Sequence, residues 1–124
     1  IIPLTYADSD DIYHEFHRLI MGQRRITSNA QVVPNIQAMI AQVANNRGAI
    51  GYIPFSHNNS TTRALHIDGI APNTEQLTNN IYPLRTTIFV IGRAEPPPQF
   101  RTFFNWVQSD NGQASLGARY IPLP

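Results

Sequence analysis

The sequence predicts a domain of the α/β or α+β class with a mixed sheet flanked by helices. Segments with apolar residues at helical spacing alternate with short runs rich in β-branched and aromatic residues, and clusters of Asn, Asp, Gly and Pro separate them. The expected order is strand, helix, helix, strand, strand, short helix, strand, helix, and this interspersion is typical of an α/β fold. A chain of 124 residues with 42% apolar residues suits one domain with one core, which we place at residues 1–124.

The first predicted strand is the apolar segment 1–6, and an acidic turn follows it. The helix after this turn carries an apolar residue at every fourth position, namely Ile12, Phe16 and Ile20. Ser9 or Asp8 is its expected N-cap, and Gly22 is its expected stop. We interpret the polar segment 23–32 as a loop.

A second helix is expected to begin at Pro34, since proline favours the first helical position. Its predicted buried stripe consists of Ile36, Met39, Ile40 and Val43. Short strands are predicted at residues 49–54 and 64–67, with an exposed polar loop at 57–62 between them. Asp68-Gly69 is predicted to form the turn that closes the second of these strands.

A capping-box pattern, Asn73 with Gln76 three residues later, predicts a short helix that ends near residue 79. Residues 86–91 form the strongest predicted strand, because every one of them is β-branched or aromatic. We expect this strand to share a sheet system with residues 49–53.

The last predicted helix follows a rigid spacer of three prolines at 96–98. Its expected buried face consists of Phe100, Phe103, Phe104 and Val107. Trp106 lies beside this stripe and is expected to be partly exposed, and a break is expected at Asp110–Gly112. These aromatic residues also suit a stacking platform for sugar or nucleic acid, but their helical spacing favours a core.

Composition excludes several classes of function. A net charge of +1 predicts no nucleic-acid partner and no attraction to an anionic membrane. The absence of cysteine excludes disulfides, thiolate metal sites and cysteine nucleophiles. No apolar run reaches the roughly 18–20 residues that span a bilayer, so no direct membrane insertion is expected. A signal peptide or lipid anchor is not visible in this sequence, which begins at Ile1.

Histidine placement suggests neither a metal site nor a catalytic centre. His14 and His17, with Asp10 preceding them, have a spacing that suits a metal, but no Cys and no H-E-x-x-H pattern accompanies them. We therefore expect solvent-facing histidines and no metal or other cofactor. His66 with Asp68 suggests acid–base chemistry, yet no nucleophile motif is present, so the chain is not expected to be an enzyme.

Four segments, taken in order, resemble motifs of the phosphate-binding family of type II periplasmic binding proteins, which serve ABC transporters. Residues 46–52 (N-R-G-A-I-G-Y) are similar to that family's N-P-G-A-I-G-Y element, with Arg in place of Pro. Residues 65–72 are similar to its L-x-I-D-G-V-x-P, and residues 82–85 to its Y-P-L-x-R-P. Residues 104–113 resemble its F-x-x-F-x-x-S-x-x-G-Q ending, and order and spacing agree over residues 16–123.

The resemblance implies a single lobe of this two-lobed α/β fold plus the C-terminal helix, with the first lobe absent from the sequence. The ligand of such proteins sits in the cleft between the lobes, so this chain would supply one wall. The implied partners are a small-molecule or ion ligand, and either ABC-transporter membrane subunits or a missing first lobe. The implied location is extracytoplasmic: periplasmic, cell-surface or secreted.

The family's ligand loop, R-x-x-x-S-G-T-x-x-x-F, holds an oxyanion through an Arg fork, two hydroxyls and backbone N–H groups at a helix N-terminus. With Phe16 as the register mark, Tyr6 stands at the Arg position. The S-G-T positions are taken by Asp10, Asp11 and Ile12, and a shift of one residue places Ser9 at the Ser position. At ~4 Å and an effective dielectric of ~20, each carboxylate repels an anion by about 4 kcal/mol. Tight phosphate binding by this loop is therefore not expected.

Two interpretations of this loop remain. In the first, an acidic, aromatic-edged pocket takes a cationic or polyhydroxy ligand, and its residues are Tyr6, Ser9, Asp10, Asp11 and Ile12, with Asp8 beside them. In the second, which we favour, the carboxylates only cap a helix and complement its dipole. The predicted function is a non-catalytic, extracytoplasmic solute-binding module whose ligand is not phosphate. The alternative is a structural or protein-interaction domain that has lost ligand binding.

Overall fold

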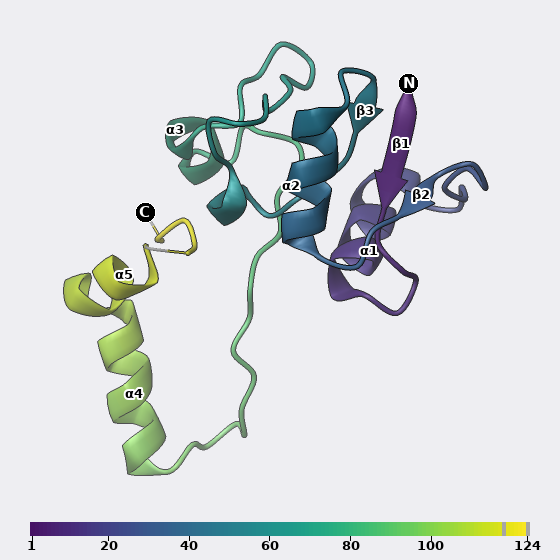
Figure 1. Ribbon diagram of the computed structural model, residues 1–124. Coiled ribbons are helices and arrows are strands. Elements are labelled where there is room, and N and C mark those ends of the chain that lie inside the picture. Colours follow the sequence, from purple (N-terminus) through teal and green to yellow (C-terminus); the bar gives the residue numbers. More distant parts are fainter. Residues whose placement is uncertain (118, 124) are drawn as a thin grey trace. The chain divides into compact units, whose positions relative to one another are not determined.

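The structure is a computed structural model that describes residues 1–117 and 119–123 (Figure 1). Contacts between backbone positions divide it into unit 1, Ile1–Ala71, and unit 2, Pro72–Pro124, and each unit is described by itself. Unit 1 holds a parallel sheet flanked by helices, which confirms the predicted α/β class. The assignment of residues 1–124 to a single domain stays a prediction.

The sheet of unit 1 has three short strands, β1 (Ile2–Thr5), β2 (Gln31–Val32) and β3 (Ala49–Ile50). Their order is β2-β1-β3, with β1 in the centre (Figure 1). Both pairings are parallel rather than mixed, with Leu4 opposite Gln31 and Ile2 opposite Ala49. Parallel neighbours require long crossover connections, and helical segments supply both of them.

The loop predicted at residues 23–32 is wrong at its end, because β2 occupies its last two residues. Both residues of β2 are exposed, so no alternation of apolar and polar side chains marks this strand. Its backbone pairing with β1 fixes it instead. β3 is shorter than the strand predicted at 49–54 and stops at Ile50.

Helix α1 (Asp11–Phe16) continues directly as a π-helical turn, η1 (His17–Met21). Asp10 is its N-cap, so the predicted caps Ser9 and Asp8 are wrong by one and two residues. The predicted stop at Gly22 is confirmed, and its φ of 56° lies in the left-handed region that favours glycine.

Helix α2 (Ile36–Asn45) begins two residues later than predicted, because Asn35 is its N-cap and Pro34 precedes the cap. The Asn35 side-chain oxygen accepts a hydrogen bond of 2.9 Å from the backbone N–H of Ala38. Met39 is fully buried, and the other three residues of the predicted stripe are partly buried, namely Ile36, Ile40 and Val43.

The core of unit 1 lies between the sheet and these helices. Its buried apolar side chains are Leu4, Tyr6, Val33 and Met39. Partly buried residues from α1, α2 and the segment after β3 pack against them, including Ile12, Ile36 and Tyr52.

The strand predicted at residues 64–67 is wrong, since the structure has only an isolated antiparallel bridge between Ile67 and Ile70. Both backbone N–H groups of this pair donate to the opposite carbonyl, at 3.0 and 2.9 Å. The predicted turn between them is confirmed: Asp68 and Gly69 have φ values of 52° and 81°. Two consecutive positive φ angles are typical of a tight type I′ turn. A single 3-10 turn, η2 (Phe55–His57), lies earlier in the segment.

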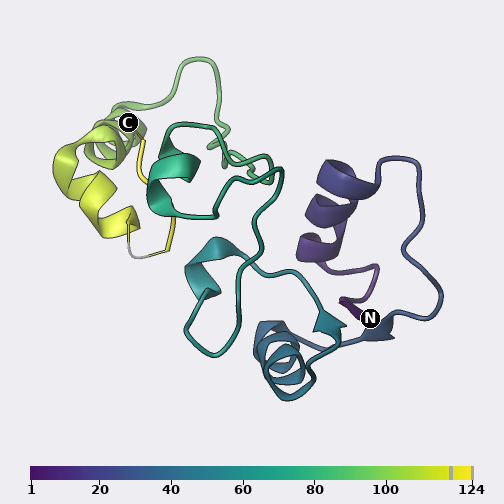
Figure 2. The same cartoon turned by 90° about the horizontal axis from the view of Figure 1, so that it is seen from above.

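Unit 2 contains the predicted short helix α3 (Thr74–Thr78), capped by Asn73, whose side chain accepts from the N–H of Gln76 at 2.9 Å. Two further helices follow, α4 (Pro98–Gln108) and α5 (Asp110–Leu116), and they are consecutive in the yellow-green part of Figure 2. A break is present, but the position predicted for it is wrong: Ser109 ends α4 and caps α5, and residues 110–112 belong to α5. None of the helices in residues 1–117 and 119–123 is long and apolar enough to cross a membrane.

The strongest predicted strand is wrong, since residues 86–91 form no strand in the structure and share no sheet with residues 49–53. Four of its apolar side chains are exposed by 63–93%, namely Ile88, Phe89, Val90 and Ile91. A strand propensity is realised only against a neighbouring strand, and the sheet in the described part of the chain, β2-β1-β3, does not include this segment.

The predicted buried face of α4 is also wrong in part. Phe100 is 51% exposed and Phe103 is 49% exposed, while Phe104 and Val107 are partly buried. The prediction that Trp106 is partly exposed is confirmed at 47%. Helical spacing gave the correct helix, but it could not say whether a partner surface lies over its aromatic stripe.

The junction of α4 and α5 provides a test of the described packing. A Cβ added to Gly112 would collide with the backbone carbonyl of Trp106, and backbone atoms cannot move aside as a side-chain tip can. We expect Gly112→Ala to lower the midpoint of thermal unfolding, reported by Trp106 fluorescence, by an amount equivalent to about 1–3 kcal/mol. Gly92→Ala is the matched control, because a Cβ there meets nothing within 4 Å. Equal midpoints for the two variants would contradict the described junction.

Candidate functional site

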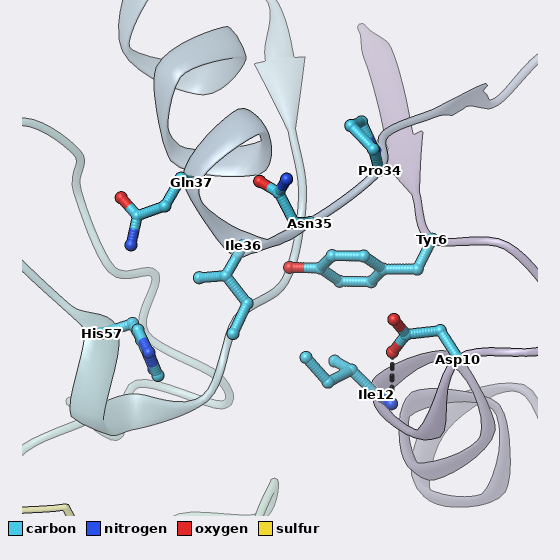
Figure 3. Close-up of a pocket in the computed structure, with 8 residues that line it drawn as sticks. All are labelled: Tyr6, Asp10, Ile12, Pro34, Asn35, Ile36, Gln37 and His57. Atoms are coloured by element: carbon cyan, nitrogen blue, oxygen red, sulfur yellow. Dashed lines mark hydrogen bonds between the residues drawn. The ribbon is translucent and has the colours of Figure 1, made fainter.

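The loop after β1 opens onto a pocket of about 330 Å³ that lies within unit 1 and is open to solvent (Figure 3). Three of the five predicted site residues line it: Tyr6, Asp10 and Ile12. Ser9 and Asp11 are exposed and do not line it. The structure therefore brings together part of the predicted set, at the edge of the sheet where β1 ends.

Asp10 occupies the N-cap of α1. Its Oδ1 atom accepts a hydrogen bond of 2.8 Å from the backbone N–H of Ile12, drawn as a dashed line in Figure 3. Its own N–H donates to the carbonyl of Ala7 at 3.0 Å, which closes the turn between strand and helix. The capping interpretation of the carboxylates thus holds for Asp10, while the carboxylate also lines the pocket.

Tyr6 lies at the floor of the pocket and is only 1% exposed. Its hydroxyl donates to the carbonyl of Tyr52 at 3.1 Å, and the two rings meet edge to face with centroids 5.3 Å apart. Burial raises the pKa of Tyr6 to about 12, and the negative charge of Asp10 and the neighbouring Tyr52 add to the shift. Tyr6 is therefore a neutral, core-anchored side chain, and its hydroxyl already has a partner.

Tyr52 connects the elements around the site. Its hydroxyl lies 2.7 Å from the Thr5 hydroxyl oxygen, at the end of β1. Its ring stacks on Phe16 of α1, with centroids 3.9 Å apart and planes 10° from parallel. The strand, the first helix and the segment after β3 are thereby held in one arrangement beneath the pocket.

The other wall of the pocket comes from residues that the sequence analysis missed. They belong to the start of α2 and to η2, and they are Pro34, Asn35, Ile36, Gln37 and His57. The place of α2 follows from the sheet: parallel strands release their helices at the same edge, so the helix after β2 begins beside the helix after β1, but no sequence pattern marked β2. No pattern marked His57 either, which reaches the pocket from a turn far along the chain.

The charge of the pocket is negative. Asp10 is an acid, and no Arg is among the lining residues. Asn35 uses its side-chain oxygen as the cap of α2, which leaves its amide N–H₂ as a donor toward other groups. His57 Nδ1 lies 3.1 Å from the Ser56 hydroxyl, and its ring is exposed. In Figure 3 the Gln37 amide extends from α2 on the same side as His57, while Ile12 lies beside Asp10 and Ile36 lies between His57 and Tyr6.

The other sequence candidates lie outside this pocket. His14 and His17 each lie against the Tyr13 ring, with centroids 5.8 Å apart. Among residues 1–117 and 119–123 no three His, Cys, Asp or Glu side chains are placed to hold a metal ion. His66 and Asp68 are exposed, and Asp68 belongs to the tight turn described above.

Comparison of the sequence with known proteins finds similar curated proteins, and no model of a protein family matches it. Protein SphX of Synechococcus elongatus is 24% identical over 137 residues, covering 99% of this chain and 41% of its own length. Phosphate-binding protein PstS 2 of Streptococcus pneumoniae is 25% identical over 95 residues, covering 74% of this chain and 33% of its own length.

Comparison of the fold finds solved structures that match nearly all of the chain. A phosphate-binding protein of a phosphate ABC transporter from Streptococcus pneumoniae has a TM-score of 0.83 with 18% identity over 98% of this chain. A putative phosphate ABC transporter substrate-binding protein from Clostridium perfringens, solved with bound phosphate, has a TM-score of 0.78 with 22% identity over 100% of this chain. The chain spans 51% and 52% of the length of these two proteins, respectively.

The chain has the fold of about half of a phosphate ABC transporter substrate-binding protein. This confirms the fold that the sequence motifs implied, and it matches the expectation of one lobe. An ABC-type phosphate transport receptor from Vibrio cholerae agrees, with a TM-score of 0.81 over 53% of its length. Within this binding-protein fold, the pocket at the end of β1 is the candidate ligand site.

The buried hydroxyl of Tyr6 leads to a prediction about alkaline stability. Because its pKa is raised from 10 to about 12 in the folded protein, the unfolded chain releases this proton first. The stabilisation is complete below about pH 10 and is lost as the pH rises toward 12. We expect Tyr6→Phe to flatten this alkaline fall in the free energy of urea unfolding. At neutral pH the free energy of unfolding of this variant should also be lower by about 1 kcal/mol, because the hydrogen bond of the Tyr6 hydroxyl is lost.

Tyr13→Phe serves as the control for this measurement, since Tyr13 lies in the same unit and is only partly buried. It should leave the free energy of unfolding at neutral pH close to that of the parent chain. A Tyr6→Phe variant with an unchanged alkaline slope would show that Tyr6 does not titrate as described.

Proposed function

We propose that unit 1 forms one wall of the ligand site of a non-catalytic, extracytoplasmic solute-binding module whose ligand is not phosphate. The supporting observation is the Asp10 carboxylate, which caps α1 and lines the pocket at the end of β1. The relatives supply the context, since those named above are described as phosphate-binding or as substrate-binding proteins of phosphate transporters.

An anion at this helix N-terminus would compete with Asp10 for the same donors. The N–H of Ile12 already has a carboxylate oxygen 2.8 Å away, so its hydrogen-bonding capacity is used. A phosphate in the pocket would face Asp10 at about 4 Å, a repulsion on the order of 4 kcal/mol at an effective dielectric of ~20. None of the lining residues is an Arg that offsets this repulsion.

The lining favours a small ligand that is cationic or carries several hydroxyl groups. The free Oδ2 of Asp10 accepts hydrogen bonds or pairs with an ammonium group. The amides of Asn35 and Gln37 offer donors, and Gln37 also offers an acceptor. Ile12 and Ile36 give apolar contact for the body of such a ligand. Ser9 and Asp11 are neighbours of Asp10 in the sequence but do not line the pocket, so they would not contact this ligand.

A second wall and a transporter complete the proposed function. The chain covers about half of the solved binding proteins it matches, so the facing wall would come from a first lobe outside this sequence or from a partner. ABC-transporter membrane subunits are the proposed recipients of the ligand, and the extracytoplasmic location follows from that role.

The role of Asp10 is tested by Asp10→Asn, which removes the charge and keeps a side-chain oxygen that caps the helix equally well. We expect inorganic phosphate to cause no thermal shift and no titration heat with the parent chain. The variant should bind phosphate at least roughly tenfold more tightly, because one like-charge repulsion is gone.

Asp11→Asn is the matched control, since Asp11 carries the same charge one residue later but does not line the pocket. It should change phosphate affinity by far less than Asp10→Asn. Phosphate binding by the parent chain that equals binding by Asp10→Asn would refute the proposed exclusion.

A second candidate function is a structural or interaction domain that keeps the fold without a ligand. It is favoured by the engagement of Asp10 in the cap and by the burial of Tyr6, which occupy one carboxylate oxygen of Asp10 and the Tyr6 hydroxyl with contacts inside the chain. A calorimetric panel of amines, sugars and oxyanions separates the two candidates. Heat of binding with an amine or a sugar supports ligand capture if Asp10→Ala abolishes that heat. No heat with any compound of the panel supports the second candidate.

A further inference from the structure

The side chains that cap α1 and α2 give the pocket two poles of opposite polarity. Asp10 caps α1, Asn35 caps α2, and both residues line the pocket. In each of them one side-chain oxygen accepts a hydrogen bond from a backbone N–H of the helix, and this bond fixes the orientation of the side chain. A charged oxygen of Asp10 and the N–H₂ group of Asn35 remain for a ligand. In Figure 3 the Tyr6 ring lies between these two side chains.

The Asp10 pole is negative and has no counter-charge. Asp10 is partly buried, and only its Oδ1 atom accepts a hydrogen bond from the residues that the structure describes. In that part of the chain no side-chain nitrogen or oxygen of a buried or partly buried residue is both buried and without a partner, so Oδ2 is accessible. Among residues 1–117 and 119–123 the Asp10 carboxylate forms no ion pair. A carboxylate that loses its water needs a cation or further donors in place of that water.

The opposite pole consists of amide groups. The oxygen of Asn35 is used by the N–H of Ala38, so its N–H₂ group is the part that a ligand can reach. Gln37, two residues farther along α2, lines the same pocket and brings a second amide. Amide donors pair with a carbonyl or carboxylate oxygen, and a ligand end of hydrocarbon alone would leave them unsatisfied. The α2 side of the pocket therefore selects a ligand with an acceptor oxygen.

We infer that the ligand of this pocket is a small amine whose other end carries a carbonyl or carboxylate oxygen, as in an amino acid or its amide. The ammonium group pairs with Asp10, and the oxygen accepts from the amides of Asn35 and Gln37. Ile12 and Ile36 offer apolar contact for the carbon atoms of the ligand. The volume of about 330 Å³ lies at the lower end of the range for small-molecule sites, which suits a ligand of few atoms. This inference rests on the proposed function and narrows its ligand class.

A neutral sugar or polyol matches this lining less well than an amine does. Its hydroxyl groups donate hydrogen bonds to Asp10 but supply no positive charge, and none of the lining residues is an Arg that would supply one. When a facing wall covers the pocket, water leaves and the attraction between opposite charges becomes stronger. The enclosed site therefore favours an ammonium group over a hydroxyl group at Asp10.

Four small probes test the inference on the whole 124-residue chain: alanine, alaninamide, propylamine and erythritol. Chemical-shift titrations followed by NMR give the dissociation constants, since they report weak binding as well. We expect alanine or alaninamide to bind at least roughly tenfold more tightly than propylamine, which lacks the acceptor oxygen. Erythritol should bind more weakly than all three amines, because it carries no charge. The ratio between alanine and alaninamide shows whether the acceptor is a carboxylate or a carbonyl group.

Two substitutions assign the two poles. Asp10→Asn keeps the helix cap and should weaken the binding of both alanine and propylamine by roughly tenfold or more, because the charge is gone. Gln37→Glu replaces an amide by a carboxylate of the same shape, and it should weaken the binding of alanine but not that of propylamine. Gln42→Glu is the matched control, since it makes the same change on the same helix at a residue that does not line the pocket. It should leave both affinities unchanged.

The outcomes separate this inference from the proposed function. Propylamine that binds as tightly as alanine and alaninamide would overturn the inference and leave a cationic ligand in place. Erythritol that binds more tightly than the amines would overturn it in favour of a polyhydroxy ligand. Equal effects of Gln37→Glu and Gln42→Glu on alanine would overturn the assignment of the α2 pole. No binding of any probe would overturn the inference as well, and the calorimetric panel described above then decides the proposed function.

Discussion

The hydrogen bond from the Tyr6 hydroxyl to the Tyr52 carbonyl is the constraint on which unit 1 depends. It joins the end of the central strand to the segment that follows β3, and the Tyr52 ring extends the connection to Phe16 of α1. The sheet has three short strands and therefore few backbone hydrogen bonds of its own. The aromatic contacts provide further connections between the strand, α1 and the segment after β3. The position of the turn that carries Asp10 follows from them.

This constraint also gives Tyr6 and Asp10 different roles in the segment after β1. Tyr6 is directed into the core, where it stabilises the fold. Asp10 lies four residues later and accepts a hydrogen bond from one of the first N–H groups of α1, that of Ile12. The Asp10 carboxylate therefore serves the helix N-terminus from within the chain and lines the pocket at the same time.

Sequence reasoning recovered the local features and missed those that depend on distant partners. The stop at Gly22, the cap at Asn73 and the turn at Asp68–Gly69 were predicted correctly, because each depends on backbone preferences of a few neighbouring residues. The strand at 86–91 was wrong, because its propensity has effect only where another strand lies alongside. Five of the eight lining residues of the pocket were missed for a related reason: His57, for example, reaches it through the tertiary fold, and no local pattern records that approach.

The exposed segment 86–91 has a consequence for the solubility of the chain. Short stretches with high strand propensity, no proline and no charge are the ones that stack into cross-β fibrils. Arg85 and Arg93 stand just outside the two ends of this stretch. In an in-register stack each would meet its own copy every ~4.8 Å, and this repeated repulsion opposes growth of a fibril. The two guanidinium groups thereby act as gatekeepers for a segment that the fold itself leaves uncovered.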